Sequence, residues 1–396
     1  MKKSVAIIGG GPAGLMLAAQ LNEIKFDVTI YERNATLGRK FLVAGEGGLN
    51  ITHSEETHQF ISRYTPASFF EKIISDFTNT DLRTWLKSIG IDTYIGSSKR
   101  VFPAKGIKPA GVLNAILNIL DKKNVIVKEN HIWKGWEKEN LLFENNDQTI
   151  SVKTDITVFA LGGASRKVTG SDGGWINYFS QKGIEIIPFQ PSNCAYRVQW
   201  EKEFIEMAEG KPLKNVSISC GDKNQKGEVV ITKFGLEGGA VYALSPQIRE
   251  QLNENKKAEI SIDLKSQFSQ EQIREKISER GNRSITKVLA DRLGFGKLQI
   301  ELLKSLLTKE EFTNAGLLAK NIKNLPVIIT GTAPIDQAIS TVGGIALTEI
   351  DSDFQLKKMP HNYVIGEMLD WDAPTGGYLL QGCFSMGHRL GKQLNH

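Results

Sequence analysis

The sequence predicts an α/β fold in which one domain is interrupted by a small β-domain and a helical insert. Residues 5–14, Val-Ala-Ile-Ile-Gly-Gly-Gly-Pro-Ala-Gly, read as a strand, a glycine turn and the start of a helix. The next apolar stretch, residues 28–31, ends at Glu32, which would accept hydrogen bonds from ribose hydroxyls. This order is that of a dinucleotide-binding, Rossmann-like domain. Later in the chain, residues 190–262 alternate as short strands do, and residues 269–324 are charged and helical.

Each glycine of the first turn has its own expected role. Gly9 permits the tight turn, Gly11 lets the backbone approach a pyrophosphate, and Gly14 lets the helix pack closely on the strand. The helix that starts at Pro12 and Ala13 offers unpaired N–H groups to the phosphates. The segment therefore predicts a site for an adenine dinucleotide.

Two further motifs distinguish a flavin from a nicotinamide. Residues 38–52 form a second glycine loop with two cations, and residues 366–381 read Gly-Glu-Met-Leu-Asp-Trp-Asp-Ala-Pro-Thr-Gly-Gly-Tyr-Leu-Leu-Gln. A nicotinamide domain needs neither motif. Together they resemble the family of FAD-dependent bacterial flavoproteins of the aminoacetone oxidase, YhiN and BaiN type, and the resemblance covers essentially the whole chain. The commoner form of that family has Arg-Cys-Asn where this chain has residues 48–50, Gly-Leu-Asn, as in a branch that also carries Ala-Leu-Gly-Gly-Ala-Ser at residues 160–165.

The resemblance and the residue chemistry together suggest how FAD would be held. Arg39 and Lys40 are candidates to neutralise the pyrophosphate, with solvated surface cations as the alternative. Asn50, in a loop flexible enough to lie against a planar ligand, could donate to the flavin edge. By resemblance, Glu367 would bond the ribityl hydroxyls. The expected cofactor contacts are Gly9, Gly11, Pro12, Ala13, Gly14, Glu32, Arg33, Gly38, Arg39, Lys40, Gly45, Gly48, Leu49, Asn50, Ile132, Ala160, Leu161, Gly162, Gly366, Glu367, Gly376, Gly377, Tyr378 and Leu379.

The reactive end of the flavin benefits from fixed positive dipoles, because reduction leaves negative charge on the ring system. Gly376 and Gly377 can present backbone N–H groups, and a helix from Tyr378 would point its N-terminus at the flavin. A glycine hinge before a packing helix is the alternative. For catalysis, Arg100 is the candidate anchor for a substrate carboxylate or carbonyl, although a lone arginine in a loop is more often a structural cation.

Bulk properties favour an ordinary enzyme of the cytoplasm. The chain has 396 residues, 40% of them hydrophobic, a formal net charge of +5 and three cysteines without a CxxC pair. These features predict a reducing compartment, no membrane segment, no metal site and no nucleic-acid partner. The expected domains are residues 1–189 as the first part of the FAD domain with a helical cap at about 55–95, residues 190–265 as a β-domain, 266–325 as a helical insert, and 326–396 as a return strand and the second FAD part.

We therefore expect an FAD-dependent oxidoreductase that acts on a small molecule, an amine or a carbonyl/ene-type compound, through non-covalent FAD. NAD(P)H would be at most a transient co-substrate, because residues 162–165 lack the spacing of a second dinucleotide turn. Two alternatives stay open: a flavin-dependent RNA-modifying enzyme and a non-catalytic flavin-binding redox sensor. The sequence does not specify the oligomeric state.

Overall fold

The chain enters a five-stranded parallel sheet at residue 3 and returns to it near its C-terminal end. In spatial order the strands are β20 (Asn362–Val364), β10 (Ile156–Phe159), β1 (Lys3–Ile8), β2 (Phe26–Tyr31) and β6 (Ile126–Lys128). Ile8 at the end of β1 pairs with Tyr31 on one side and Phe159 on the other. The central strands are buried on both faces, as in parallel sheets covered by helices. The computed structural model describes residues 1–44 and 48–396.

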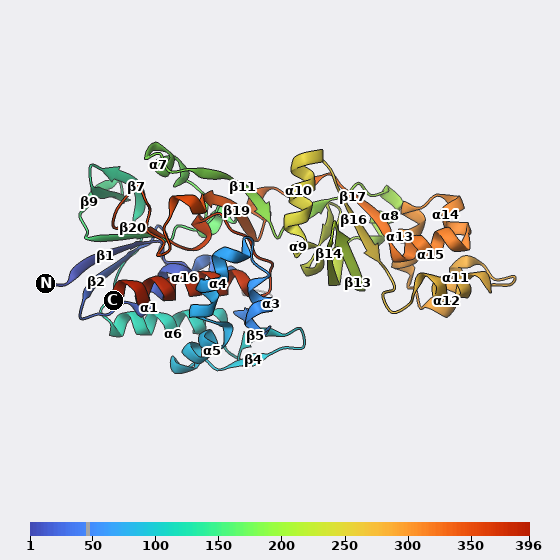
Figure 1. The fold of residues 1–396 in the computed structure, drawn as a ribbon, viewed down its shortest axis with the longest axis horizontal. Helices are drawn as coiled ribbons and strands as arrows, with labels where there is room; N and C mark the ends of the chain where they lie inside the picture. The colour runs from blue at the N-terminus through green and yellow to red at the C-terminus, as the bar shows by residue number, and fades with distance from the viewer. Residues whose placement is uncertain (45–47) are drawn as a thin grey trace. The chain divides into compact units, whose positions relative to one another are not determined.

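Helices α1 (Pro12–Gln20) and α16 (Tyr378–Asn395), from opposite ends of the chain, lie side by side (Figure 1). Glycines on α16 make this approach possible. A Cβ at Gly387 would lie 2.4 Å from the carbonyl oxygen of Ala13, and one at Gly391 would lie 2.5 Å from Cβ of Gln20. The close packing places the first turns of both helices in the same unit as the cavities described below.

Short elements complete this unit. The cap consists of α3 (Thr57–Ile61), α4 (Ala67–Asp76) and α5 (Asn79–Ser88), with a small sheet of β3 (Thr52–His53), β5 (Arg100–Pro103) and β4 (Thr93–Ile95). The other elements are α2 (Arg39–Val43), α6 (Pro109–Lys122), η1 (Lys167–Thr169), α7 (Ile176–Gln181), β11 (Ile186–Ser192), η2 (Ile335–Gln337), β19 (Ser340–Ile345), η3 (Leu347–Glu349) and η4 (Gly366–Met368).

Ile132, an expected cofactor contact, does not continue strand β6. Asn130 has a φ of 56°, which turns the chain, and Ile132 begins a separate antiparallel sheet. That sheet consists of β7 (Ile132–Glu137), β8 (Asn140–Asn145) and β9 (Gln148–Val152).

The chain divides into two compact units. The first comprises Met1–Pro191 and Ile335–His396, and the second comprises Ser192–Pro334. The second unit has a seven-stranded sheet in the order β17 (Leu325–Ile329), β16 (Ala258–Asp263), β13 (Pro212–Cys220), β14 (Lys223–Ile231), β15 (Gly235–Glu237), β12 (Tyr196–Arg197) and β18 (Gly331–Thr332). Its helices are α8 (Lys202–Ala208), α9 (Gly239–Tyr242), α10 (Ser245–Asn255), α11 (Gln270–Ser278), α12 (Ile285–Leu293), α13 (Lys297–Leu306), α14 (Lys309–Thr313) and α15 (Ala315–Lys323).

The strand expected to return to the FAD sheet from residue 326 belongs instead to this second unit. β17 pairs antiparallel with β16, with Val327 opposite Ile260, and its alternate side chains are buried there. The strands and helices of residues 192–334 therefore share one unit rather than separate β and helical inserts. The α/β class with a Rossmann-like parallel sheet is confirmed. No helix in the described parts of the chain combines the length and apolarity that a membrane span requires.

Candidate functional site

The turn between β1 and α1 contains glycines of two kinds. A Cβ at Gly9, where φ is 108°, would lie 2.4 Å from the carbonyl oxygen of Ala160, and one at Gly14 would lie 2.4 Å from that of Gly9. These two glycines are required by the packing of the protein itself. A Cβ at Gly11 would meet no described atom within 4 Å, because it would point into open space. That space belongs to a cavity, so Gly11 leaves room for a ligand.

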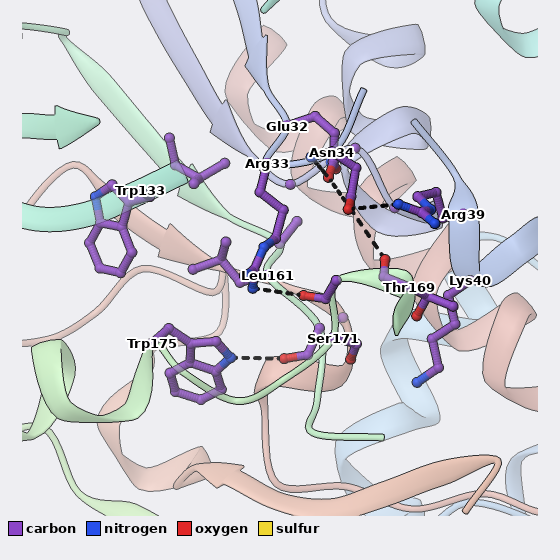
Figure 2. A pocket seen from close by; sticks show the side chains of 18 of the residues that line it. Glu32, Arg33, Asn34, Arg39, Lys40, Trp133, Leu161, Thr169, Ser171 and Trp175 are labelled. Carbon is purple, nitrogen blue, oxygen red and sulfur yellow. Dashed lines mark hydrogen bonds between the residues drawn. The ribbon is translucent and has the colours of Figure 1, made fainter. Parts of the chain in front are cut away.

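The first cavity, of about 230 Å³, opens at this turn. Figure 2 shows the indoles of Trp133 and Trp175 at one side and the side chains of Arg39 and Lys40 at the other. Fifteen of the expected cofactor contacts line it: Gly9, Gly11, Pro12, Ala13, Glu32, Arg33, Gly38, Arg39, Lys40, Ile132, Ala160, Leu161, Gly162, Gly366 and Glu367. The helix N-terminus at Pro12 makes this cavity suitable for phosphate groups.

Glu32 is held in place at the end of β2. One carboxylate oxygen accepts from the Gly10 N–H at 2.9 Å, and the other accepts from the backbone and side-chain nitrogens of Asn34 at 2.9 and 2.7 Å. A carboxylate has about four acceptor positions, so one remains for a hydroxyl. Its place at the cavity wall is suitable for binding a ribose.

Residues 166–174, which we call the strap, contribute Thr169 and Ser171 to the lining of the first cavity (Figure 2). Arg33 donates to the Gly170 carbonyl at 3.2 Å and to Asp172 at 2.7 Å. Burial alone would raise the pKa of Asp172, but hydrogen bonds from the Gly174 N–H and from Arg33 outweigh it and lower the pKa. The hydroxyl of Ser171 is buried and has no partner among the described residues. It is a polar group that a ligand could satisfy.

A second cavity, of about 330 Å³, adjoins the first. The two share Pro12, Lys40, Phe41, Glu367 and Cys383 as lining residues, so together they form one groove. Of the expected cofactor contacts, Leu49, Asn50, Gly376, Gly377 and Leu379 line the second cavity.

An ion pair lies where the cavities meet. Lys40 donates to Glu367 at 2.8 Å and to the hydroxyl of Ser165 at 3.0 Å, and the two charged side chains are 25% and 14% exposed. Lys40 thus contacts the carboxylate expected to bind the ribityl chain. Burial, with a smaller contribution from Glu367, raises the pKa of Cys383, so this thiol stays protonated.

The start of α16 borders the second cavity. Gly376 and Gly377 have φ of 114° and 98°, and a Cβ at Gly377 would lie 2.5 Å from Cα of Thr52. Glycine is required there both by conformation and by space. The free N–H groups of the helix then start beside Gly376 and Gly377, where they can stabilise negative charge on a ligand.

Tyr378 does not line either cavity in the described residues. Its ring packs against His53 at 5.3 Å and Phe60 at 4.7 Å between centroids, and its hydroxyl donates to Glu55 at 2.8 Å. Burial, then the bond to Glu55, raises the Tyr378 pKa. Burial alone would raise the Glu55 pKa, but bonds from Arg63 and Tyr378 lower it. The side chain of Tyr378 therefore stabilises the start of α16, and its ring lies next to the groove, because a Cβ at Gly376 would be 3.5 Å from its Cε2 atom.

Arg100 begins strand β5 rather than lying in a loop, because it pairs with His53 in the small sheet. Its side chain lies beside the second cavity: a Cβ at Gly376 would be 3.5 Å from its Nε atom. The guanidinium makes no hydrogen bond or ion pair with any residue that the structure describes. Gly14 and Gly48 lie outside both linings, and Gly45 lies outside the described residues.

Sequence reasoning missed the strap. Its residues Ser171 and Asp172, and the indole of Trp175, line the first cavity, and Arg166 lines the second. The run Gly-Ser-Asp-Gly-Gly at residues 170–174 was the available signal, because such a run cannot form a regular element. Cys383 was also missed, since an isolated cysteine on a helix gives no indication of a groove.

The residues of the groove and the space between them fit FAD. Its two cavities share five lining residues, it includes the open space at Gly11, and the buried Ser171 hydroxyl lacks a partner among the described residues. The glycine turn and Glu32 would hold the adenosine and phosphates in the first cavity. Glu367, Asn50 and the start of α16 would hold the ribityl chain and flavin in the second.

Comparison with known proteins agrees with this geometry. The HI0933-like protein Rossmann domain matches residues 3–393. The chain belongs to the HI0933-like family. It is 23% identical to the 3-dehydro-bile acid delta(4,6)-reductase of Clostridium scindens, over 98% of each chain. It is 24% identical to the ribosomal RNA dihydrouridine synthase of Haemophilus influenzae, over 96% of each chain.

The fold also resembles that of a Rhodococcus jostii 3-ketosteroid-delta4-(5alpha)-dehydrogenase, with a TM-score of 0.53 at 12% identity over 100% of this chain and 97% of that one. The recognised family and the expected enzyme class are confirmed, and this HI0933-like protein is an FAD-dependent oxidoreductase. The expectation of no nucleic-acid partner has no support, because one relative named above modifies ribosomal RNA. In the described part of the chain, no three His, Cys, Asp or Glu side chains are grouped to hold a metal.

Proposed function

We propose that this protein reduces a carbon–carbon double bond conjugated to a carbonyl group in a small molecule, or catalyses the reverse desaturation. Two relatives are named for such chemistry. A 3-dehydro-bile acid delta(4,6)-reductase acts on double bonds of a compound with a 3-oxo group, and dihydrouridine results from saturating the uracil double bond next to a carbonyl. Of the expected substrates, the amine and the carbonyl/ene compound, these relatives favour the second.

The observation that carries the proposal is the free guanidinium of Arg100 beside the second cavity. In the reductive direction, reduced FAD would supply a hydride to the far carbon of the conjugated double bond, and a proton taken up from water would complete the new C–H bond on the other carbon. Addition to a conjugated double bond moves negative charge onto the carbonyl oxygen, and a fixed cation there stabilises the transition state. Arg100 would hold that oxygen through a charge-assisted hydrogen bond, and its lack of another partner among described residues leaves it free to do so.

A reductase also needs an electron donor. We propose NAD(P)H as a transient co-substrate that visits the second cavity, because the glycine turn at Gly9 to Gly14 is already assigned to FAD. Stopped-flow mixing of the oxidised holoenzyme with NADH or NADPH would measure the rate at which each nucleotide reduces the flavin. Bleaching of the flavin absorbance by either nucleotide supports the role, and the absence of bleaching with both would exclude it.

The central test is reoxidation of the photoreduced holoenzyme under anaerobic conditions. We expect a conjugated enone such as 2-cyclohexenone, or a 3-oxo-4-ene steroid, to restore the oxidised flavin spectrum. The saturated ketone cyclohexanone and the isolated alkene cyclohexene serve as matched controls and should leave the flavin reduced. If enones, ketone and alkene all fail while an amine reduces the oxidised enzyme, the amine expectation is the correct one.

Reduction of uridine in ribosomal RNA is a second candidate, favoured by the relative from Haemophilus influenzae. The chemistry is the same, and only the substrate differs. Mass spectrometry of ribosomal RNA from cells with and without the gene would decide between them. Loss of a dihydrouridine in the deletion strain would favour RNA over a small molecule.

A further inference from the structure

The charges of the side chains that line the second cavity do not cancel. They are Lys40, Glu367 and Arg166. Lys40 and Glu367 neutralise each other through their 2.8 Å ion pair. The guanidinium of Arg166 makes no hydrogen bond or ion pair within residues 1–44 and 48–396. The described lining of this cavity therefore carries one unneutralised positive charge, in addition to Arg100 nearby.

The backbone at Arg166 is held in an uncommon conformation. Its φ of 60° and ψ of 56° lie in the left-handed region, which residues other than glycine avoid. The carbonyl oxygen of Arg166 accepts from the N–H and hydroxyl of Thr169 at 2.8 and 2.7 Å, and its N–H donates to the Asp336 carbonyl at 3.3 Å. Hydrogen bonds within the first unit thus fix the point from which the side chain extends.

The acid bonded to this turn does not neutralise the guanidinium. Asp336 accepts, through Oδ1, from the backbone N–H of Lys167 at 2.6 Å. Its carboxylate is thereby used to hold the strap rather than the Arg166 side chain. Arg166 is exposed, and its guanidinium, at the wall of the second cavity and without a partner among the described residues, is accessible to a ligand.

We propose that Arg166 binds an anionic group of the substrate, a carboxylate or a phosphate, in the second cavity. The inference rests on the proposed function, because it concerns the compound that meets the flavin there. A guanidinium can donate two parallel hydrogen bonds to either oxyanion, which gives both affinity and orientation. Arg166 would then select acidic substrates, whereas Arg100 contacts the carbonyl that is chemically activated.

The test measures binding to the oxidised holoenzyme through perturbation of the flavin absorbance. The probes are trans-cinnamate, phenyl phosphate and cinnamamide, the last being the neutral analogue of the first. We expect the wild-type protein to bind one of the anions about tenfold more tightly than cinnamamide. Whichever anion is preferred identifies the class of acid.

The decisive variant is Arg166→Gln, with Lys167→Gln as the matched control. Lys167 is the neighbouring exposed cation and lies outside both cavity linings. Arg166→Gln should lose the tenfold preference with unchanged affinity for cinnamamide, and Lys167→Gln should keep it. A wild-type protein without preference for either anion, including one that binds none of the probes, overturns the proposal, as does equal loss in both variants.

A second readout separates this proposal from the proposed function. Reoxidation by neutral 2-cyclohexenone is measured on the wild-type holoenzyme in parallel, because that compound carries no charge and tests the proposed reaction alone. Turnover of the enone without an anion preference defeats the role of Arg166 alone. An anion preference without reoxidation by any conjugated compound defeats the proposed reaction and leaves the anion site standing.

Discussion

The cationic side chains at the two cavities of the groove differ in whether they have partners. In the first, Arg33 is paired with Asp172 and Arg39 donates to Asn34 at 3.1 Å. At the second, the guanidinium groups of Arg100 and Arg166 have no partner in the part of the chain that the structure describes. The first cavity thus relies on backbone groups and fixed polar contacts, which suit a resident cofactor. The second keeps free charge, which suits a substrate that comes and goes.

The largest expected effect is the loss of FAD binding when Gly11, which leaves room for a ligand, is replaced, in contrast to Gly14, which the packing of the protein requires. Gly11→Val should abolish FAD binding, because the side chain would fill open space in the first cavity while touching no described atom. Gly14→Val should instead destabilise the protein, since its Cβ would lie 2.4 Å from the Gly9 carbonyl oxygen. FAD content after heat release and urea unfolding of both variants would check this.

The wild-type protein in that experiment should release FAD, not FMN, into the supernatant, because the groove extends over both cavities. Normal FAD content in a folded Gly11→Val protein would show that the first cavity is not the phosphate site.

The next effect concerns the second cavity. Arg100→Ala should keep FAD and stability but lower kcat/KM for the enone about ten- to hundredfold, as expected for a lost hydrogen bond of roughly 1.5–3 kcal/mol. Lys99→Ala removes the adjacent charge and should have little effect. Equal rates for Arg100→Ala and wild type would make Arg100 a structural cation.

A smaller effect is expected where the cavities meet. Glu367→Gln removes the ion pair with Lys40 and should weaken FAD binding about tenfold, because hydrogen bonds to a charged group are worth roughly 1.5–3 kcal/mol. Lys40→Met should weaken it too, and the double variant should lose less than the sum if Lys40 acts by orienting Glu367. Additive losses in a titration of the apoprotein with FAD would mean that the two residues act independently.

The smallest effect is a dependence of stability on pH. The folded-state pKa of Glu55 is lowered, because hydrogen bonds from Arg63 and Tyr378 outweigh burial. Its stabilising contribution is therefore present above the unfolded pKa of 4.5 and is lost as the pH falls through the lower folded value. Urea unfolding from pH 7 to pH 3 should show a shallower acid loss in Glu55→Gln than in wild type. Parallel curves would contradict the lowered pKa.

How much the sequence predicts also differs between the cavities. Gly14 and Glu32 contact Gly9 and Gly10 of the turn between β1 and α1, so a local pattern is enough to place them. Arg166 begins the strap, and its N–H is bonded to Asp336, which is 170 residues away in the chain. No local pattern encodes that contact.

The direction in which a side chain points, and the strand with which a segment pairs, are also not encoded locally. The sequence does not show that the Tyr378 hydroxyl bonds to Glu55 and that its ring packs beside His53, next to the lining residue Gly376. The apolar strand at residues 325–329 could join either sheet, and pairing with β16 decides it. Periodicity identifies a strand but does not name its neighbour.

The central claim is that one molecule of FAD extends through both cavities with its reactive ring at the second. A crystal structure of the purified holoprotein would test this most directly. We predict the pyrophosphate at Gly11 and the flavin ring beside Gly376, with Arg100 facing the open side of the ring. A flavin ring in the first cavity, or FAD outside the groove, would contradict the account.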